Sequence, residues 1–171
     1  TSLPPTASAQ DMTFFRIGTG GTAGTYYPVG ALIANVISNP PGSRPCDKGG
    51  SCGVPGLVAT AQSSEGSVAN IEAIESGSVE SGFCQSDVVF WAYNGSGIFE
   101  GSPPQRDLRL IGSLYPEVVQ IVVRHDSGIT SIPEMAGKRI SLDVEGSGTL
   151  VDARIVLESY GMTDADLQAE Y

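Results

Sequence analysis

Apolar positions along the chain follow two spacings in turn, one typical of strands and one typical of helices. Residues 14–17 form a short apolar run that predicts a strand ending at Gly18. Residues 25–38 then place apolar side chains three and four positions apart, which predicts a helix. The alternation continues with predicted strands at residues 54–61, 81–84, 108–114, 118–123 and 138–143, and predicted helices at residues 67–77, 88–93, 131–137 and 149–160. Strands that alternate with helices predict an α/β fold with a parallel sheet.

Two later segments carry clear signals of their own. Valine and isoleucine fill five of the six positions in residues 118–123, so this run is the most strand-like of the chain. Residues 163–166 have the pattern of an N-terminal cap, which predicts one more helix.

A change of composition at residues 113–117 divides the chain into a fuller first unit and a thinner second one. The second unit has too few elements to close a sheet of ordinary size, so we expect a truncated protein.

The 171-residue chain is globular in composition, with 40% hydrophobic residues, and it carries a formal net charge of -10. This charge excludes nucleic acid as an expected ligand, because neutralising phosphates requires a basic surface. An anionic ligand would therefore be held by local backbone dipoles rather than by the overall field of the protein. An acidic surface with no role in binding explains the charge equally well.

The first residues suggest export. Ala7-Ser8-Ala9 followed by Gln10 is the small-residue pattern at which a signal peptidase cleaves. We therefore expect residues 1–9 to be the end of a signal peptide, and the protein to be periplasmic after cleavage near Gln10.

The cysteines agree with an oxidising compartment. Cys46 and Cys52 flank a short loop rich in glycine and proline, which predicts a disulfide between them. A zinc site is the alternative, but zinc prefers four ligands and the only histidine, His125, lies far along the chain. Cys84 falls in an apolar run and is expected to be a small buried hydrophobic residue.

A glycine-rich loop, GTGGTAGT at residues 18–25, joins the first predicted strand to the first predicted helix. Glycines allow the backbone to approach a ligand closely, and the free N–H groups of a helix N-terminus favour an anion. A dinucleotide fingerprint would also require an acidic residue about twenty positions on, at the tip of the second strand. The second predicted strand ends some forty positions on with no acid there, so a nicotinamide cofactor is not expected.

Two more strand-to-helix junctions carry glycine and hydroxyl residues. Ser67 opens a predicted helix with Asn70 one turn later, and Ser147, Gly148 and Thr149 open another. Serine and threonine are ordinary helix caps, so one such loop says little. Three of them place N–H and O–H donors at the carboxyl edge of the strands, where open α/β sheets bind ligands.

No arrangement of residues typical of catalysis is found in the sequence. His125 lies between Arg124 and Asp126 at the end of a strand, and no nucleophile elbow is present. Gln85 and Asp87 follow a short strand and point toward the binding edge, although Asp87 also fits the cap of the next helix. Tyr26, Tyr27 and Tyr115 are candidates for the walls of a cleft, with burial at a domain seam as the alternative.

Five motifs resemble, in the same order, those of one family, the TAXI group of TRAP-transporter solute receptors. They are IGTGGTAGTYYP at residues 17–28, GSVAN at 66–70, QSDV at 85–88, SLYPE at 113–117 and GSGT at 146–149. The resemblance spans roughly residues 14–171. It implies a periplasmic two-lobed receptor of the type II binding-protein fold, with a first lobe at residues 10–116 and the start of an incomplete second lobe at 117–171.

The same resemblance implies capture of a glutamate, glutamine or dicarboxylate solute and its delivery to an integral-membrane TRAP permease. We expect a monomer, with no cofactor and no metal. The ligand contacts that the resemblance implies, together with Tyr115, are Gly21, Thr22, Tyr26, Ser67, Asn70, Gln85, Asp87, Ser147, Gly148 and Thr149. Glu117 and its neighbours are placed to form a hinge strand.

Two other classes of function stay open. One is an α/β enzyme that acts on a phosphorylated or nucleotide substrate through the glycine-rich loop, which needs a positioned base or a metal. The other is a surface structural protein that binds no ligand.

Overall fold

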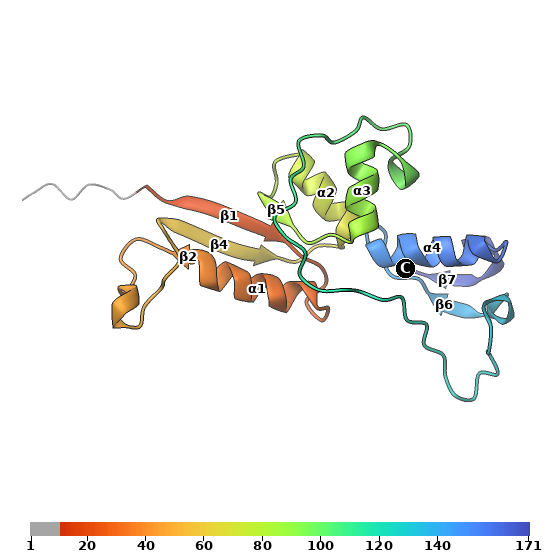
Figure 1. The fold of residues 1–171 in the computed structure, drawn as a ribbon. Coiled ribbons are helices and arrows are strands. Elements are labelled where there is room, and N and C mark those ends of the chain that lie inside the picture. The colour runs from red at the N-terminus through yellow and green to blue at the C-terminus, as the bar shows by residue number, and fades with distance from the viewer. Residues whose placement is uncertain (1–10) are drawn as a thin grey trace, which may run out of the picture.

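The structure is a computed structural model that describes residues 11–171. The predicted end of the signal peptide and the cleavage site near Gln10 lie outside the described residues. The described chain is elongated, with one sheet toward its N-terminal end and a smaller sheet at the opposite end (Figure 1). Within residues 11–171, no helix has the length and apolar character needed to cross a lipid bilayer.

A three-stranded parallel sheet forms the first part of the fold. β1 (Thr13–Gly18) lies between β4 (Leu57–Gln62) and β5 (Ser81–Gly82). The parallel pairing confirms the predicted α/β class, and it brings the carboxyl ends of all three strands to one edge. The predicted strands at residues 14–17 and 81–84 are confirmed, although the second is only two residues long.

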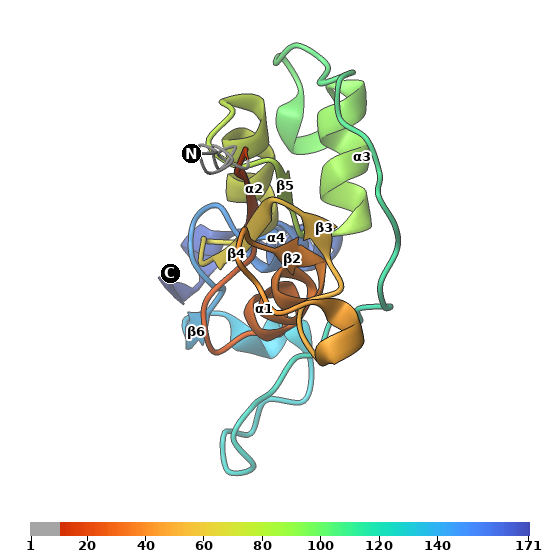
Figure 2. The same ribbon diagram turned by 90° about the vertical axis from the view of Figure 1, so that its left-hand side faces the viewer.

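Three helices accompany this sheet, and their starts agree with the predicted ones to within two residues. α1 (Tyr26–Ile37) runs along one face, whereas α2 (Ser67–Glu75) and α3 (Ser86–Asn94) lie toward the other (Figures 1 and 2). Each strand therefore passes through a loop at the carboxyl edge before the next helix begins. This connectivity places the loops at residues 19–25 and 63–66 side by side.

Apolar clusters hold these helices in place. Ile17, Ala34 and Phe83 pack between the sheet and α1. Ile71 of α2 and Val88 of α3 are at most 1% exposed and form the centre of a second cluster. Burying a side chain of this size contributes about 1.5–3 kcal/mol, so the two clusters fix the helix starts relative to the strand ends.

The second part of the fold is a smaller parallel pair with one helix. β6 (Arg139–Ser141) pairs with β7 (Gln168–Glu170), and α4 (Gly148–Ser159) packs on them. The predicted capping box is confirmed at Ser131, where it opens a short 3-10 helix, Ile132–Met135. The core of this part consists of Leu142, Leu150, Leu157 and Met162.

The cap predicted at residues 163–166 is confirmed, but the helix that it opens is only one turn long. Asp164–Asp166 is a single 3-10 turn, capped by Thr163, and the chain then enters β7. The backbone N–H of Gln168 donates to the carbonyl oxygen of Lys138 at 2.8 Å. Pairing with β6 satisfies the backbone groups that a further helix would have to satisfy internally, so the cap motif ends after one turn.

The single strand predicted at residues 54–61 is two strands. Gly56 adopts a φ of +81°, a left-handed conformation that interrupts a strand. β3 (Val54–Pro55) consequently pairs with β2 (Ser38–Asn39) in a separate two-stranded sheet, and β4 begins at Leu57. The predicted loop at residues 39–53 lies between these elements.

The strands predicted at residues 108–114 and 118–123 are also wrong. This stretch is extended, but within the described chain the backbone of residues 109–123 makes no hydrogen bond to another segment. Ile111 is 84% exposed and Val122 89% exposed. β-Branched residues fit an extended backbone, but a strand also requires a neighbouring strand to pair with, and composition does not reveal whether one is present.

The predicted disulfide between Cys46 and Cys52 is confirmed. It closes the loop between β2 and β3, which lies away from the carboxyl edge of the first sheet. Cys84, the free cysteine, is partly buried against the α2–α3 cluster, as expected for a small hydrophobic residue.

Replacing both Cys46 and Cys52 by serine is expected to lower the free energy of unfolding by about 2 kcal/mol, because the six-residue separation closes only a short loop. Urea denaturation with and without a reductant measures this loss. Arg44→Ala, an exposed change in the same loop, serves as the control and is expected to stay within about 0.5 kcal/mol of the wild type. A double serine protein of unchanged stability would contradict the prediction.

Candidate functional site

Asn70 connects the loops at the carboxyl edge of the first sheet. Its side chain is fully buried, and its amide nitrogen donates to the carbonyl oxygens of Thr19 at 2.7 Å and Phe83 at 2.8 Å. Its amide oxygen accepts from the Ser64 hydroxyl at 2.7 Å. Three loops that are distant in the sequence are therefore held by one side chain, whose two N–H donors are both used within the protein.

The loop before α4 packs directly on the start of α2. The carbonyl oxygen of Gly146 accepts from the backbone N–H groups of Val68 at 3.0 Å and Ala69 at 3.1 Å. A Cβ added to Gly66 would lie 3.4 Å from the Cα of Ser147. The N-terminal donors of α2, which the sequence suggested for an anion, are thus occupied by a carbonyl of the protein itself.

Buried serines complete this junction. The hydroxyl of Ser67, which is 1% exposed, accepts from the backbone N–H of Gln85 at 3.0 Å. The hydroxyl of Ser147 caps α4 by accepting from the N–H of Leu150 at 3.0 Å. Gly148 lies so close to Gln85 that a Cβ there would be 1.5 Å from its amide oxygen. Ser67, Ser147 and Gly148 are buried beneath the surface of the site and hold its loops in position.

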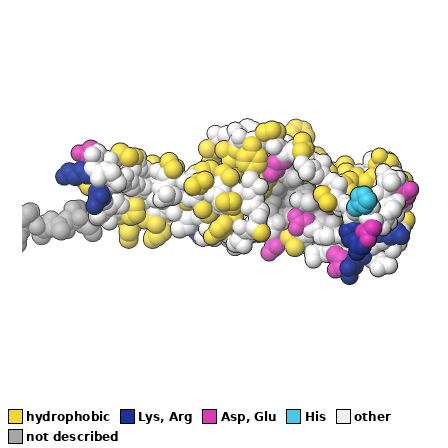
Figure 3. Space-filling model, turned by 90° about the horizontal axis from the view of Figure 1, so that it is seen from below, with side chains coloured by type: hydrophobic (Ala, Val, Ile, Leu, Met, Phe, Trp, Pro, Cys, Tyr) yellow, Lys and Arg dark blue, Asp and Glu magenta, His cyan; other side chains and the backbone are white. Residues whose placement is uncertain are grey.

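An open cleft runs between α1, α3, α4 and the extended segment 107–122. The side chains predicted as ligand contacts that line it are Tyr26, Gln85, Asp87, Tyr115 and Thr149. The structure thus brings together residues from four separate motifs of the sequence. On the face drawn in Figure 3, basic side chains gather at the two ends of the molecule together with acidic ones, and further acidic side chains lie in the middle.

The other predicted contacts do not line this cleft. Gly21 and Thr22 are exposed in the loop before α1, and no heavy atom lies within 4 Å of a Cβ added to Gly21. The remaining four form the buried junction described above: Ser67, Asn70, Ser147 and Gly148. Their role as direct ligand contacts stays a prediction.

Tyr26 fastens the segment around Glu117 to the first helix. Its hydroxyl donates to a carboxylate oxygen of Glu117 at 2.9 Å, and its ring packs on Phe83 with centroids 5.2 Å apart. Burial raises the pKa of Tyr26 well above its usual range, and the Glu117 carboxylate raises it further. Tyr26 therefore stays protonated and acts as a donor at one wall of the cleft.

Carboxyl groups from two different helices meet at the opposite wall. The side-chain amide of Gln85 donates to a carboxyl oxygen of Asp152 at 3.1 Å. Burial raises the pKa of Asp152 to about 6, and a hydrogen bond and charge from Asp87 raise it as well. The amide oxygen of Gln85 and the hydroxyl of Tyr115 are buried without a hydrogen-bond partner among the described residues.

Asp152 and Glu117 line the cleft, although the motifs did not single them out as ligand contacts. A signal for Asp152 was available, because it lies three residues after Thr149 and so shares a face of the predicted helix. Glu117 was placed in a hinge, two positions after Tyr115. Its contact with Tyr26 depends on a separation of 91 residues, which no local pattern encodes.

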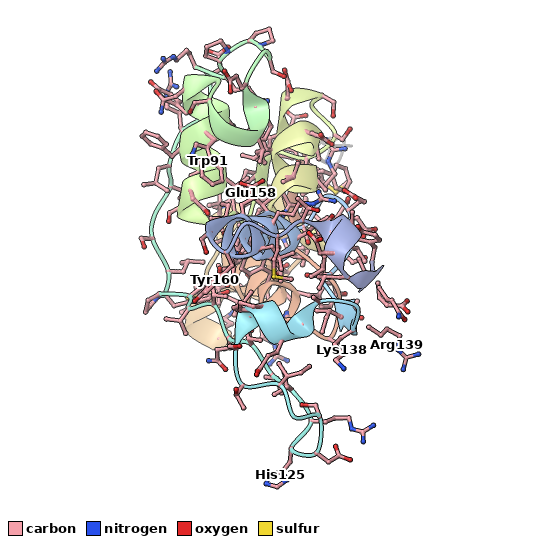
Figure 4. The ribbon with its side chains drawn as sticks, turned by 90° about the vertical axis from the view of Figure 1, so that its right-hand side faces the viewer. Trp91, His125, Lys138, Arg139, Glu158 and Tyr160 are labelled. Carbon is pink, nitrogen blue, oxygen red and sulfur yellow. A yellow bond between two sulfur atoms is a disulfide. The ribbon has the colours of Figure 1, made fainter. Side chains whose placement is uncertain are left out.

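The single histidine of the chain lies outside the cleft, and its free cysteine is unreactive. His125 is exposed at the tip of a projecting loop (Figure 4). Burial raises the pKa of the Cys84 thiol to about 12, which makes it a poor nucleophile at neutral pH. Within residues 11–171, no cluster of three or more histidine, cysteine or acidic side chains is arranged to hold a metal ion.

A comparison with known protein families shows to which family the chain belongs. The model of the NMT1-like family matches residues 17–171, which include every loop of the cleft. This family is related to the substrate-binding proteins of ABC and TRAP transporters, and its members are generally non-enzymatic proteins with a small-molecule ligand. The chain belongs to the NMT1-like family of solute-binding proteins.

Proposed function

We propose that the protein is an extracytoplasmic solute receptor of the TAXI type, which captures a small anionic metabolite and delivers it to a TRAP-type membrane permease. The observation that carries the proposal is the convergence of Tyr26, Gln85, Asp87, Tyr115 and Thr149 on one cleft in a chain of this family. Binding without chemistry requires only that such side chains be held in place. The disulfide is consistent with a periplasmic location.

The solute's carboxylate is proposed to bind at the start of α1, whose first residue, Tyr26, lines the cleft. No side chain caps the start of this twelve-residue helix, and Gly21 leaves open space above the loop before it. Free N–H groups and the helix dipole favour an anion there. Thr22 adds an exposed hydroxyl in the same loop.

The acidic side chains at the opposite wall of the cleft are proposed to bind a second group of the solute. Asp87 and Asp152, with Glu117 nearby, disfavour a further carboxylate and favour an ammonium group. Among the solutes implied by the motifs, this favours glutamate or glutamine over a simple dicarboxylate. Tyr26 then covers the apolar part of the solute between the two ends.

The buried residues act through this arrangement rather than on the solute. Ser67 and Asn70 hold the strand-end loops, whereas Ser147 and Gly148 seat the start of α4. We propose that residues 10–116 form the first lobe and that the second lobe begins at residue 117. Closure of one lobe on the other would then trap the solute in the cleft.

Thermal-shift screening of the full chain against glutamate, glutamine, 2-oxoglutarate and succinate tests the proposal. A solute present at about one hundred times its Kd stabilises by about 2.7 kcal/mol, so Tm is expected to rise by roughly 5–10 °C. If no solute of this panel raises Tm, the proposed function is wrong.

An accompanying variant connects the binding to the cleft. Asp87→Asn removes the charge that faces the ammonium group, and we expect the affinity for an amino acid to fall about tenfold. Asp47→Asn, an exposed acid in the disulfide loop, is the matched control and should bind like the wild type. Turnover of a phosphorylated or nucleotide substrate by the full chain would instead favour the enzyme alternative.

A further inference from the structure

Gln85 precedes α3, and its side chain reaches across to the second turn of α4. The amide nitrogen donates to Oδ2 of Asp152 at 3.1 Å, and this is the one hydrogen bond that the side chain makes within residues 11–171. The amide oxygen is buried and meets no donor in that part of the chain. The orientation of the amide follows from the chemistry of its partner, because a carboxylate accepts hydrogen bonds and cannot donate them. Gln85 therefore holds the carboxylate of Asp152 by one N–H group.

Gly148, the first residue of α4, leaves the space in which the end of this glutamine lies. A Cβ added to Gly148 would be 1.5 Å from the amide oxygen of Gln85 and 2.5 Å from its Cδ. It would also be 2.8 Å from the hydroxyl of Ser67. The backbone of Gly148 is not left-handed, so a larger residue is excluded by these neighbours and not by backbone strain. A side chain at position 148 would push the amide of Gln85 away from Asp152.

The other neighbours of Asp152 act against the negative charge of its carboxylate. Burial disfavours the charge, and the acidic groups of Asp87 and Glu117 disfavour it as well. Within residues 11–171, no lysine or arginine forms an ion pair with Asp152. The N–H of Gln85 favours the charged form, because a hydrogen-bond donor stabilises a carboxylate. An ionised Asp152, which an ammonium group requires as its partner, thus depends on this contact.

We propose that Gln85 is a positioning residue, which with Gly148 beside it holds the carboxylate of Asp152 in place for the solute's ammonium group. The inference rests on the proposed function, because the ammonium group belongs to the amino-acid solute proposed above. Gln85 and Asp152 both line the cleft. The N–H of Gln85 binds Oδ2 and leaves Oδ1 to accept from the solute. Gln85 then acts on the solute through Asp152.

A comparison of glutamate with 2-oxoglutarate tests this role, because the second solute carries a keto oxygen in place of the ammonium group. Gln85→Met keeps the length of the side chain and removes the N–H. Isothermal titration calorimetry on the full chain is expected to show glutamate bound about tenfold more weakly, and 2-oxoglutarate bound as by the wild type. An equal loss of affinity for both solutes would mean that Gln85 supports only the shape of the cleft, and would overturn the inference.

Gln105→Met is the matched control. Gln105 is also half-buried, its amide donates to Glu75 at 2.8 Å, and its amide oxygen likewise has no partner among the described residues. Neither Gln105 nor Glu75 lines the cleft. This variant should therefore bind both solutes like the wild type, and a selective loss of glutamate affinity in it would contradict the assignment to Gln85.

Gly148→Ala tests the second half of the proposal. The added Cβ displaces the amide of Gln85, so the variant should lose affinity for glutamate and keep its affinity for 2-oxoglutarate. In a Gln85→Ala background the amide is already absent, and Gly148→Ala should then weaken glutamate binding no further. The same further loss with and without Gln85 would show that Gly148 does not act through this side chain.

A measurement without solute tests the contact between Gln85 and Asp152 independently of binding. The carboxyl ¹³C resonance of Asp152 is followed by NMR as the pH is changed. Its pKa is about 6 in the wild type, and it should rise in Gln85→Met, because the carboxylate loses its donor, but not in Gln105→Met. An unchanged pKa in Gln85→Met overturns the inference. Because no solute is added here, a wrong proposed function would be detected separately, in the thermal-shift screen.

Discussion

Asn70→Ala is expected to lower the free energy of unfolding by about 3 kcal/mol, because three hydrogen bonds worth about 1 kcal/mol each disappear from a buried site. The carbonyl oxygen of Phe83 loses its amide donor, and Thr19 and Ser64 lose their shared partner. The loops at the carboxyl edge then separate from α2. Thermal denaturation should show Tm lower by roughly 6–12 °C.

Two further substitutions distinguish this explanation from a general sensitivity of the helices to substitution. Asn35→Ala changes the same residue type on the exposed face of α1 and should stay within about 0.5 kcal/mol of the wild type. Asn70→Asp keeps the volume but points a carboxylate oxygen at two carbonyl oxygens, so it should be at least as destabilising as alanine. An Asn70→Ala protein with wild-type Tm would contradict the role assigned to this side chain.

Gly18→Ala is expected to destabilise the protein by about 3 kcal/mol, although alanine is normally accepted at the end of a strand. A Cβ at this position would lie 2.4 Å from the amide oxygen of Asn70 and 3.0 Å from its Cγ. Asn70 cannot move aside without breaking its three hydrogen bonds. Urea denaturation should therefore show a midpoint clearly below that of the wild type.

The cause of this loss is tested by a double-mutant cycle. Shortening Asn70 to alanine makes room for the added methyl group, so Gly18→Ala with Asn70→Ala should cost at least about 1 kcal/mol less than the sum of the single changes. Gly21→Ala is the control, because a Cβ there meets no heavy atom within 4 Å. Additive effects of the two substitutions would show that the clash with Asn70 is not the cause.

The elements that were predicted correctly are those whose signals are local. Spacing of apolar residues was sufficient for α1, α2 and α4, and the capping box at Ser131 was sufficient for the start of a short helix. The strand predicted at residues 118–123 is wrong because strand formation does not depend on local signals alone. Its composition favours an extended chain, and the chain is extended there, but pairing depends on what lies beside it in space.

The residues of the candidate site also divide into those that local motifs predicted and those whose role depends on distant contacts. Tyr26, Gln85 and Thr149 belong to motifs, and the parallel sheet brings them to one cleft as expected for strand-to-helix loops. Asn70 was noticed for its amide, but its hydrogen bonds to loops 51 and 13 residues away show a structural use that its motif does not reveal. Asp152 was missed because its importance arises from Asp87, 65 positions earlier in the chain.

Native mass spectrometry of the full chain, purified without added solute, tests the central claim most directly. The account predicts a single non-covalent adduct that is released on denaturation and identified as a metabolite bearing a carboxylate, of the glutamate or glutamine class. The carboxylate is expected because the start of α1 offers uncapped N–H groups, and the ammonium group because Asp87 faces the cleft. A molecule that carries no carboxylate, bound in place of such a metabolite, would contradict it.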